Sequence, residues 1–347
     1  MMIANATGCS SIYGASAPTT PYRKDDKGEG PAWANSLFED NAEFGMGMQV
    51  ATETIRHRIQ NIMSETMEEA PNALTALYKD WIANRQNGEA TQGIRDRLIP
   101  LLEANQSVKG VKELLSLKGY LVKRSQWIIG GDGWAYDIGF GGLDHVLASG
   151  EDVNVLVLDT EVYSNTGGQS SKSAHAGSIA QFAASGKPTQ KKDLGYIAMT
   201  YGNIYVAQIN SNASQAQTLK AMQEAEAYDG PSLIIAYSPC IAHGIKGGMG
   251  QSGKQGELAS KCGYWPIYTY DPRLEAEGKN PIKITGKEPD WDQYEAFLMN
   301  EVRYVSLKKS NPKEAARLYA KNKADSMRRW RQLKRMASMD FSDEIVE

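Results

Sequence analysis

The sequence predicts an α/β fold in which helices cover both faces of a parallel sheet, with a helical insertion. From residue 120 onward, short and almost continuously apolar runs alternate with segments of helical spacing, which is typical of parallel strands buried on both faces. A separate stretch, 46–118, has helical spacing without a strand-like run. The four runs expected as strands are 125–130, 153–159, 204–209 and 232–237.

The composition is that of a globular protein. Of the 347 residues, 41% are hydrophobic and 23% are charged, and the formal net charge is −3. This balance gives no reason to expect binding to nucleic acid or to an anionic membrane. No apolar run reaches the roughly 18–20 residues of a membrane span, and the first residues lack the features of a signal peptide, so we expect a cytoplasmic protein. Three cysteines are too few, and odd in number, for a disulfide framework.

The chain begins with a short apolar run and continues into a long loop at 19–31, where turn formers and charges leave no apolar face. In the following stretch Ile55, Ile59 and Ile62 fall near helical spacing, and no candidate chemistry stands out there. The domains expected are an α/β domain at 1–45 and 119–290, a helical insertion at 46–118 and a C-terminal helical extension at 291–347.

Two helices are expected between the strands, at 134–149 and 213–228. Either Asn212 or Ser214 is a suitable N-cap for the second helix. Residues 290–336 also have helical spacing and become rich in Lys and Arg toward their end. Because the overall charge is negative, a solvated amphipathic helix is favoured there over a patch that binds nucleic acid.

The turn after the first predicted strand is the strongest candidate for chemistry. Residues 130–134 read Gly-Gly-Asp-Gly-Trp, and glycines at the start of a helix leave backbone N–H groups free to bind phosphate. The carboxylate of Asp132 would repel phosphate but suits Mg²⁺. The turn therefore indicates a diphosphate bridged by a metal ion, although a capping or turn role would explain Asp132 taken alone.

A second polar turn follows the next predicted strand, at 158–169, and contains Thr160 and Asn165. A neighbouring parallel strand would place this turn beside Asp132, at the edge where such sheets bind ligands. Two protein segments and the diphosphate oxygens would then supply the near-octahedral oxygen ligands that Mg²⁺ requires.

Two other phosphate-binding motifs fit less well. A dinucleotide-binding fingerprint needs a third glycine, but Trp134, Ala135 and Tyr136 follow Gly133. The segment 248–254 approaches a P-loop, but Gln255 stands where a Ser or Thr would bind Mg²⁺, and no predicted strand directly precedes it. A glycine-rich loop is the favoured interpretation of that segment.

The Gly-Asp-Gly turn followed about thirty residues later by Asn165 resembles the signature of thiamine-diphosphate enzymes. Most of the chain resembles, more closely, the C-terminal thiamine-diphosphate domain of the pyruvate:ferredoxin (flavodoxin) oxidoreductases. The segments that carry this resemblance are 4–14, 31–33, 36–45, 130–134, 160–169, 183–187 and 237–241.

The resemblance implies roles for particular residues. Asp132, Thr160 and the carbonyl of Val162 correspond to the Mg²⁺ ligands, and Asn165 to a catalytic residue near the reacting end of the cofactor. Cys9 and Cys240 correspond to two of the four ligands of a [4Fe–4S] cluster, while Cys262 matches no ligand. The residues implied in cofactor binding are Cys9, Gly131, Asp132, Gly133, Trp134, Thr160, Glu161, Val162, Tyr163, Ser164 and Asn165.

The resemblance also implies an activity, the oxidative decarboxylation of pyruvate to acetyl-CoA and CO₂. Pyruvate, coenzyme A, ferredoxin or flavodoxin, and the remaining domains of a homodimeric enzyme would be the partners. The family's other two cluster cysteines lie in a C-x-x-C-G-E segment that would precede Met1, so we expect a piece of a larger enzyme, inactive alone. A non-redox thiamine-diphosphate 2-oxoacid decarboxylase and a P-loop nucleotide binder stay open as alternatives.

Overall fold

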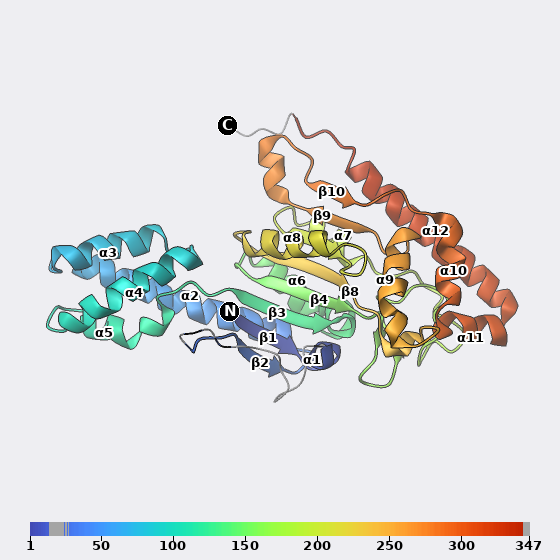
Figure 1. Ribbon diagram of the computed structural model, residues 1–347, viewed down its shortest axis with the longest axis horizontal. Coiled ribbons are helices and arrows are strands. Elements are labelled where there is room, and N and C mark those ends of the chain that lie inside the picture. Colours follow the sequence, from blue (N-terminus) through green and yellow to red (C-terminus); the bar gives the residue numbers. More distant parts are fainter. Residues whose placement is uncertain (14–23, 25, 27, 343–347) are drawn as a thin grey trace.

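The computed structural model describes residues 1–13, 24, 26 and 28–342, and it has two visibly separate parts (Figure 1). A large α/β body contains the sheet, and a lobe built from α3, α4 and α5 projects from one end of it. Helices α9 to α12 lie at the opposite end of the body (Figure 1). Most of the predicted loop at 19–31 lies outside the described residues, as do the last five residues of the chain.

Eight strands form one sheet in the order β10-β9-β7-β8-β4-β3-β1-β2. Neighbouring strands from β2 to β7 in this order are parallel, whereas β9 runs antiparallel to β7, and β10 to β9. The strands of this sheet are β1 (Met2–Ala6), β2 (Ala32–Ser36), β3 (Gln126–Gly131), β4 (Asn154–Asp159), β7 (Tyr205–Ile209), β8 (Ser232–Tyr237), β9 (Ile267–Tyr270) and β10 (Ile282–Thr285). A separate short hairpin joins β5 (Val162–Tyr163) to β6 (Gln169–Ser170).

The predicted α/β fold is confirmed, with one correction at the edge of the sheet. Six strands are parallel as predicted, but β9 and β10 are antiparallel, so the sheet is mixed. The four predicted strands correspond to β3, β4, β7 and β8. The other four, of four or five residues each, were not predicted. A run of this length does not by itself distinguish a strand from another structure by periodicity.

Alternate side chains of the strands enter two different apolar layers, which explains the near-continuous apolar runs. Leu233 and Ile235 of β8 join one layer, which α2, α6 and α7 cover through residues such as Leu143 and Leu194. Ile234 points to the opposite layer, where α8 packs with Ala221. Both faces of the sheet are therefore covered by helices.

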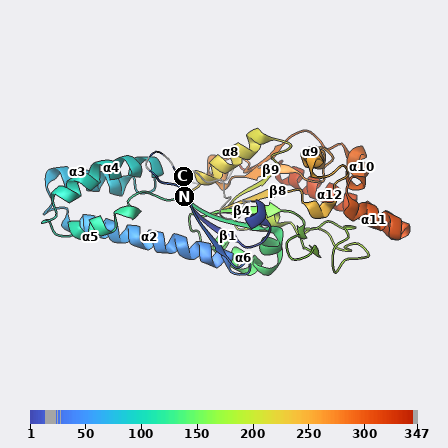
Figure 2. The same ribbon diagram turned by 60° about the horizontal axis from the view of Figure 1, so that its bottom comes forward.

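Helix α2 (Asn41–Thr66) connects the body to the lobe. Its first half packs on β1 and β3, where Gly45 leaves no room for a side chain, since an added Cβ would lie 2.5 Å from Cγ1 of Ile128. Figure 2 shows α2 continuing from its place beside α6 out to the lobe. The lobe has its own core around Trp81 and Leu98, and its helices are α3 (Asn72–Ala83), α4 (Gly88–Ala104), α5 (Val111–Ser116) and η1 (Lys118–Tyr120).

The helix expected at 134–149 is divided at Gly139 into a π-helix and an α-helix. The helix expected at 213–228 is α8, and the Ser214 side chain caps it by accepting from the backbone N–H of Gln217. The remaining helices that precede residue 290 are α1 (Cys9–Tyr13), η2 (Gly133–Ile138), α6 (Phe140–Ala148), α7 (Leu194–Met199), α8 (Gln215–Glu226), η3 (Ile241–His243), η4 (Met249–Gln251), α9 (Ser252–Lys261) and η5 (Pro272–Glu277).

The C-terminal segment forms η6 (Trp291–Gln293), α10 (Tyr294–Met299), α11 (Val302–Ser310) and α12 (Pro312–Met336). Basic residues of α12 pair with nearby acids: Arg329 with Asp193 at 3.0 Å and Lys334 with Glu288 at 2.6 Å. These pairs agree with an amphipathic helix that covers the body, rather than with a free basic patch. Within the described part of the chain, no helix is long and apolar enough to cross a bilayer.

Candidate functional site

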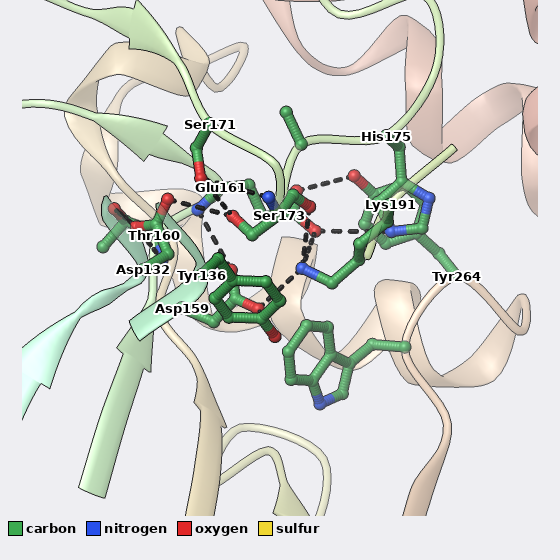
Figure 3. Close-up of polar contacts among 12 residues, drawn as sticks. Asp132, Tyr136, Asp159, Thr160, Glu161, Ser171, Ser173, His175, Lys191 and Tyr264 are labelled. Atoms are coloured by element: carbon green, nitrogen blue, oxygen red, sulfur yellow. Dashed lines mark hydrogen bonds and ion pairs between the residues drawn. The ribbon is translucent and has the colours of Figure 1, made fainter. Parts of the chain in front are cut away.

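The two polar turns predicted from the sequence meet at the carboxyl ends of β3 and β4. These strands are paired, with Gly131 opposite Leu158, so Asp132 and Thr160 leave the sheet side by side. The hydroxyl of Thr160 lies 2.7 Å from Oδ1 of Asp132 and 3.0 Å from the carbonyl oxygen of Val162. The Thr160 hydroxyl therefore lies close to both of the other groups that the resemblance implies as Mg²⁺ ligands, as Figure 3 shows for Asp132 and Thr160.

The spacing of these oxygens fits a magnesium ion. Mg²⁺ binds oxygens in an octahedron at about 2.1 Å, so adjacent ligand oxygens lie about 3 Å apart. The two distances from the Thr160 hydroxyl are 2.7 Å and 3.0 Å. A carboxylate, a hydroxyl and a backbone carbonyl are also the hard ligands that this ion prefers.

The charge at Asp132 fits a cation as well. The side chain is completely buried, and none of the described Lys, Arg or His residues forms an ion pair with it. Burial, and next the nearby carboxylate of Asp159, raise the pKa of Asp132 to about 7. The hydroxyl of Ser173 donates to Oδ2 at 2.9 Å, a contact that the sequence gave no reason to expect. A buried carboxylate without a positive partner is costly unless a cation accompanies it.

A pocket opens next to this oxygen cluster and contains about 360 Å³ of space, its open mouth included. Gly131 and Gly133, on either side of Asp132, form part of its wall. Asn165, the predicted catalytic residue, also lines it. The complete lining is Thr7, Gly8, Cys9, Phe38, Gly131, Gly133, Trp134, Tyr163, Ser164, Asn165 and Thr166. Seven of these are residues for which the sequence predicted cofactor binding, and Thr7, Gly8, Phe38 and Thr166 were missed.

Tyr163 and Gly133 fix one wall of the pocket. The phenol hydroxyl donates to the carbonyl of Gly133 at 3.0 Å, and the ring lies over the glycine. A Cβ added to Gly133 would come within 2.5 Å of Cε1 of Tyr163. The second glycine of the Gly-Asp-Gly turn is thus required by its contact with the ring of Tyr163.

Cys9 and Cys240 both lie against the turn that contains Thr160. Sγ of Cys9 is 3.8 Å from the Thr160 hydroxyl, and Sγ of Cys240 is 2.7 Å from the hydroxyl of Ser164. Within the described parts of the chain, no group of three or more His, Cys, Asp or Glu side chains is arranged to hold a metal. Cys262 is buried near the end of α9, and burial raises the pKa of its thiol to about 12.

The carboxylate of Glu161, in the middle of the turn, lies in a buried ion network. Oε2 accepts from Nη2 of Arg303 at 2.7 Å and from the hydroxyl of Tyr264 at 2.6 Å. Its φ of 58° is in the left-handed region, which costs a residue with a side chain about 1 kcal/mol. Glu161 was predicted to bind cofactor; like Asp132, Thr160 and Val162 it does not line the pocket, and its part in binding stays a prediction.

A second buried ion pair lies below the turn. Nζ of Lys191 is 2.6 Å from Oδ2 of Asp159, which also accepts from Tyr136 at 2.7 Å (Figure 3). The same ammonium donates to the carbonyl of Ser173 at 2.8 Å, and this connects the network to the Asp132 site. In the sequence Lys191 stands in a lysine-rich segment typical of a solvent-exposed loop, so no local signal identified it.

The P-loop alternative lacks the required architecture. Strand β8 ends at Tyr237, and η3 intervenes before Gly248. Lys254 is inside α9, which begins at Ser252. A P-loop needs a strand that leads directly into the glycine-rich loop, and this segment has none.

Comparisons with known proteins agree with this site. Residues 110–236 match the family model described as "Thiamine pyrophosphate enzyme, C-terminal TPP binding domain". The pyruvate-flavodoxin oxidoreductase of Klebsiella pneumoniae is 53% identical over 339 residues, which are 97% of this chain and 29% of the relative. The pyruvate:ferredoxin oxidoreductase of Moorella thermoacetica is 53% identical over 344 residues, which again are 97% of this chain and 29% of the relative. The pyruvate-flavodoxin oxidoreductase of Enterobacter agglomerans is 54% identical over 346 residues, again 97% and 29%.

The chain therefore spans about 29% of the length of these curated relatives. The family resemblance expected from the sequence is confirmed along almost the whole chain.

Proposed function

We propose that this chain, which belongs to the thiamine pyrophosphate-binding domains of the pyruvate:ferredoxin and pyruvate-flavodoxin oxidoreductases, binds thiamine diphosphate through Mg²⁺. As part of a larger enzyme it contributes this cofactor to the oxidative decarboxylation of pyruvate, which yields acetyl-CoA and CO₂. The electrons pass through iron–sulfur clusters to ferredoxin or flavodoxin. Homodimer formation and a cytoplasmic location stay predictions from the sequence.

The observation that carries the proposal is the oxygen cluster beside the pocket. Asp132, Thr160 and the carbonyl of Val162 converge at the spacing of adjacent ligands of Mg²⁺. The pocket next to them is lined by glycines at the start of η2, where free backbone N–H groups favour a diphosphate.

Each of these side chains has a definite role in the site. Asp132 supplies the negative charge that holds the metal ion, and Ser173 fixes the second oxygen of that carboxylate. Tyr163 and Trp134 form part of the wall of the pocket. When bound, the cofactor supplies the carbon nucleophile and the electron sink for decarboxylation. Asn165 lines the same pocket and orients a polar group of the reactants by hydrogen bonding.

Cys9 and Cys240 are proposed as two thiolate ligands of a [4Fe–4S] cluster, which requires four. Their closeness to the turn that contains Thr160 and Ser164 supports this assignment, since it puts both thiols beside the proposed cofactor site. The two further cysteines would come from outside this chain. Analysis of iron and acid-labile sulfide in the full-length protein tests the assignment, and a protein without both would instead support the non-redox decarboxylase.

Calorimetric titration with thiamine diphosphate in the presence of Mg²⁺ tests the cofactor assignment. We expect saturable binding that disappears when the metal is chelated and in the Asp132→Asn variant. A titration with ATP is the matched comparison for the P-loop alternative. Binding of ATP without any binding of thiamine diphosphate would contradict the proposal.

A further inference from the structure

The turn that carries two of the proposed Mg²⁺ ligands has an unusual backbone at its centre. Glu161, between Thr160 and Val162, has a φ of 58°. Left-handed backbone is unfavourable for a residue with a Cβ, and it persists only where the surroundings fix it. This conformation lets the Thr160 hydroxyl and the Val162 carbonyl face each other at 3.0 Å, although Glu161 separates them in the chain.

The side chain of Glu161 shows what fixes the turn. Its Oε2 accepts from Arg303 at 2.7 Å and from Tyr264 at 2.6 Å, and Lys191 lies 3.5 Å from Oε1. The carboxyl group is fully buried. The residue is therefore a carboxylate anchored to two cations and one phenol.

The anchors are themselves held by the C-terminal helices. Nε of Arg303 in α11 donates to Glu301 at 2.7 Å, and Glu301 accepts from Gln255 of α9 at 2.9 Å. On the other side of the turn, Nε2 of His243 is 2.7 Å from the carbonyl of Thr160. Because a carbonyl only accepts, this nitrogen carries the proton.

We propose that Glu161 is a positioning residue for the metal ion, anchored by Arg303 and Tyr264, rather than a residue that contacts the cofactor. The anchor holds the left-handed turn that aims the Thr160 hydroxyl and the Val162 carbonyl at Asp132. The proposal rests on the Mg²⁺ site of the proposed function. It explains why the side chain of Glu161, in the middle of a ligand-binding turn, points into the protein. The affinity for metal then depends on Tyr264 and Arg303, which are 103 and 142 positions away from Glu161 in the chain.

The decisive experiment compares affinity for metal with stability in variants that remove the anchor. Glu161→Gln combined with Arg303→Met removes both charges of this pair at similar volume. It leaves the buried carboxylate of Glu301 without Arg303, so the free energy of unfolding is measured beside the affinity for metal. Tyr264→Phe is a milder variant, because it keeps the ring that stacks on His175 at 4.1 Å and removes only the hydroxyl. Both are made in the full-length protein, and Mg²⁺-dependent binding of thiamine diphosphate is measured by calorimetry.

We expect the double variant to bind Mg²⁺ about 10- to 100-fold more weakly, as is usual when a partner that orients a metal ligand is lost. Tyr264→Phe should cause a smaller loss in the same direction. Affinity measured with Ca²⁺ should fall less than affinity measured with Mg²⁺, because Ca²⁺ tolerates irregular ligand geometry. A residue that only stabilised the fold would not change the preference between the two ions.

The matched control is a partly buried pair near the amino ends of β3 and β4, Lys123 and Asp152, whose charged atoms are 2.7 Å apart. Lys123→Met with Asp152→Asn should leave the affinity for Mg²⁺ unchanged even if the melting temperature falls. Wild-type affinity and ion preference in both anchor variants would overturn the proposal. If the unmodified protein itself shows no Mg²⁺-dependent binding, the proposed function fails instead, and Asp132→Asn then gives the same result as wild type.

Discussion

At the scale of single residues, Asp132 has the surroundings expected of a carboxylate that binds a cation. It is buried, it has no ion-pair partner among the described residues, and hydroxyls of Thr160 and Ser173 donate to its two oxygens. Those hydrogen bonds orient the carboxylate but do not neutralise it. The residue therefore serves binding at the expense of stability in the metal-free protein, as functional residues often do.

Replacing Asp132 with Asn should separate its contribution to ligand binding from its cost to the stability of the metal-free protein. The amide has the same shape and still accepts one hydrogen bond, so without ligand the variant should be at least as stable as wild type. Thermal unfolding without and with Mg²⁺ and thiamine diphosphate measures this directly. We expect the ligands to raise the melting temperature of wild type only. A ligand-induced increase of the same size in Asp132→Asn would show that the carboxylate does not hold the metal.

Gly133 permits a second test at the residue scale. A methyl group there would lie 2.5 Å from the ring of Tyr163, so Gly133→Ala should cost about 1–3 kcal/mol of unfolding free energy. It should also displace the ring and weaken cofactor binding. Gly141 in α6 is the control, because nothing lies within 4 Å of an added Cβ, and Gly141→Ala should stabilise by about 0.5–1 kcal/mol. Chemical denaturation measures both, and equal effects would contradict the steric argument.

At the scale of elements, the lobe and the body have separate cores. Leu98 of α4 is fully buried in the core of the lobe, which shares no residue with either apolar layer of the sheet. Among the helices and strands of the described residues, α2 alone contributes to both cores, with Ala42 in one and Ile59 in the other. The lobe can therefore lose order while the site at the carboxyl ends of β3 and β4 keeps its geometry.

Leu98→Ala tests this independence. Creating a cavity in the lobe should cost about 2–5 kcal/mol, and hydrogen exchange should become faster in α3, α4 and α5 but not in β3 and β4. The control is Leu219→Ala on α8, because Leu219 is 61% exposed, with an expected change within about 0.5 kcal/mol. Faster exchange throughout the sheet in Leu98→Ala would mean that lobe and body unfold together.

At the scale of the whole molecule, buried charges connect segments that are distant in the sequence. The Asp159–Lys191 pair joins the end of β4 to the loop that carries Ser173, and Arg303 joins α11 to Glu161. Through Arg303, the C-terminal helix α11 therefore helps to hold the turn that contains Glu161. Such pairs are costly to break singly, because the remaining charge stays buried without a partner.

Lys191→Met should accordingly destabilise the protein by about 3–5 kcal/mol. Adding Asp159→Asn should recover much of the loss, since the double variant leaves neither charge unpaired. Lys220→Met is the control, because Lys220 is 60% exposed and its pair with Glu224 is at the surface, where such pairs contribute about 0–1 kcal/mol. Urea denaturation of the four proteins forms the test, and a double variant no more stable than Lys191→Met would refute the charge argument.

The parts predicted correctly share a local cause. Strands β3, β4, β7 and β8 are buried on both faces, so their apolar runs were visible in the sequence. The meeting of the turns that follow β3 and β4 was also predictable, because parallel strands end at the same edge of the sheet. The roles of Asp132 and Thr160 as metal ligands stay predictions. The resemblance to pyruvate oxidoreductases added Cys9 and Cys240, whose role as cluster ligands stays a prediction, as does catalysis by Asn165.

By itself, the sequence determined the α/β class, the two turns that meet and the thiamine pyrophosphate-binding family. Only the tertiary structure decided that Glu161 points into an ion network, that Ser173 holds Asp132 and that β9 and β10 are antiparallel. The reason is physical: apolar periodicity and turn residues act over a few positions and leave a pattern in the chain. A buried ion pair between residues 142 positions apart leaves no such pattern, because its partners are chosen by packing.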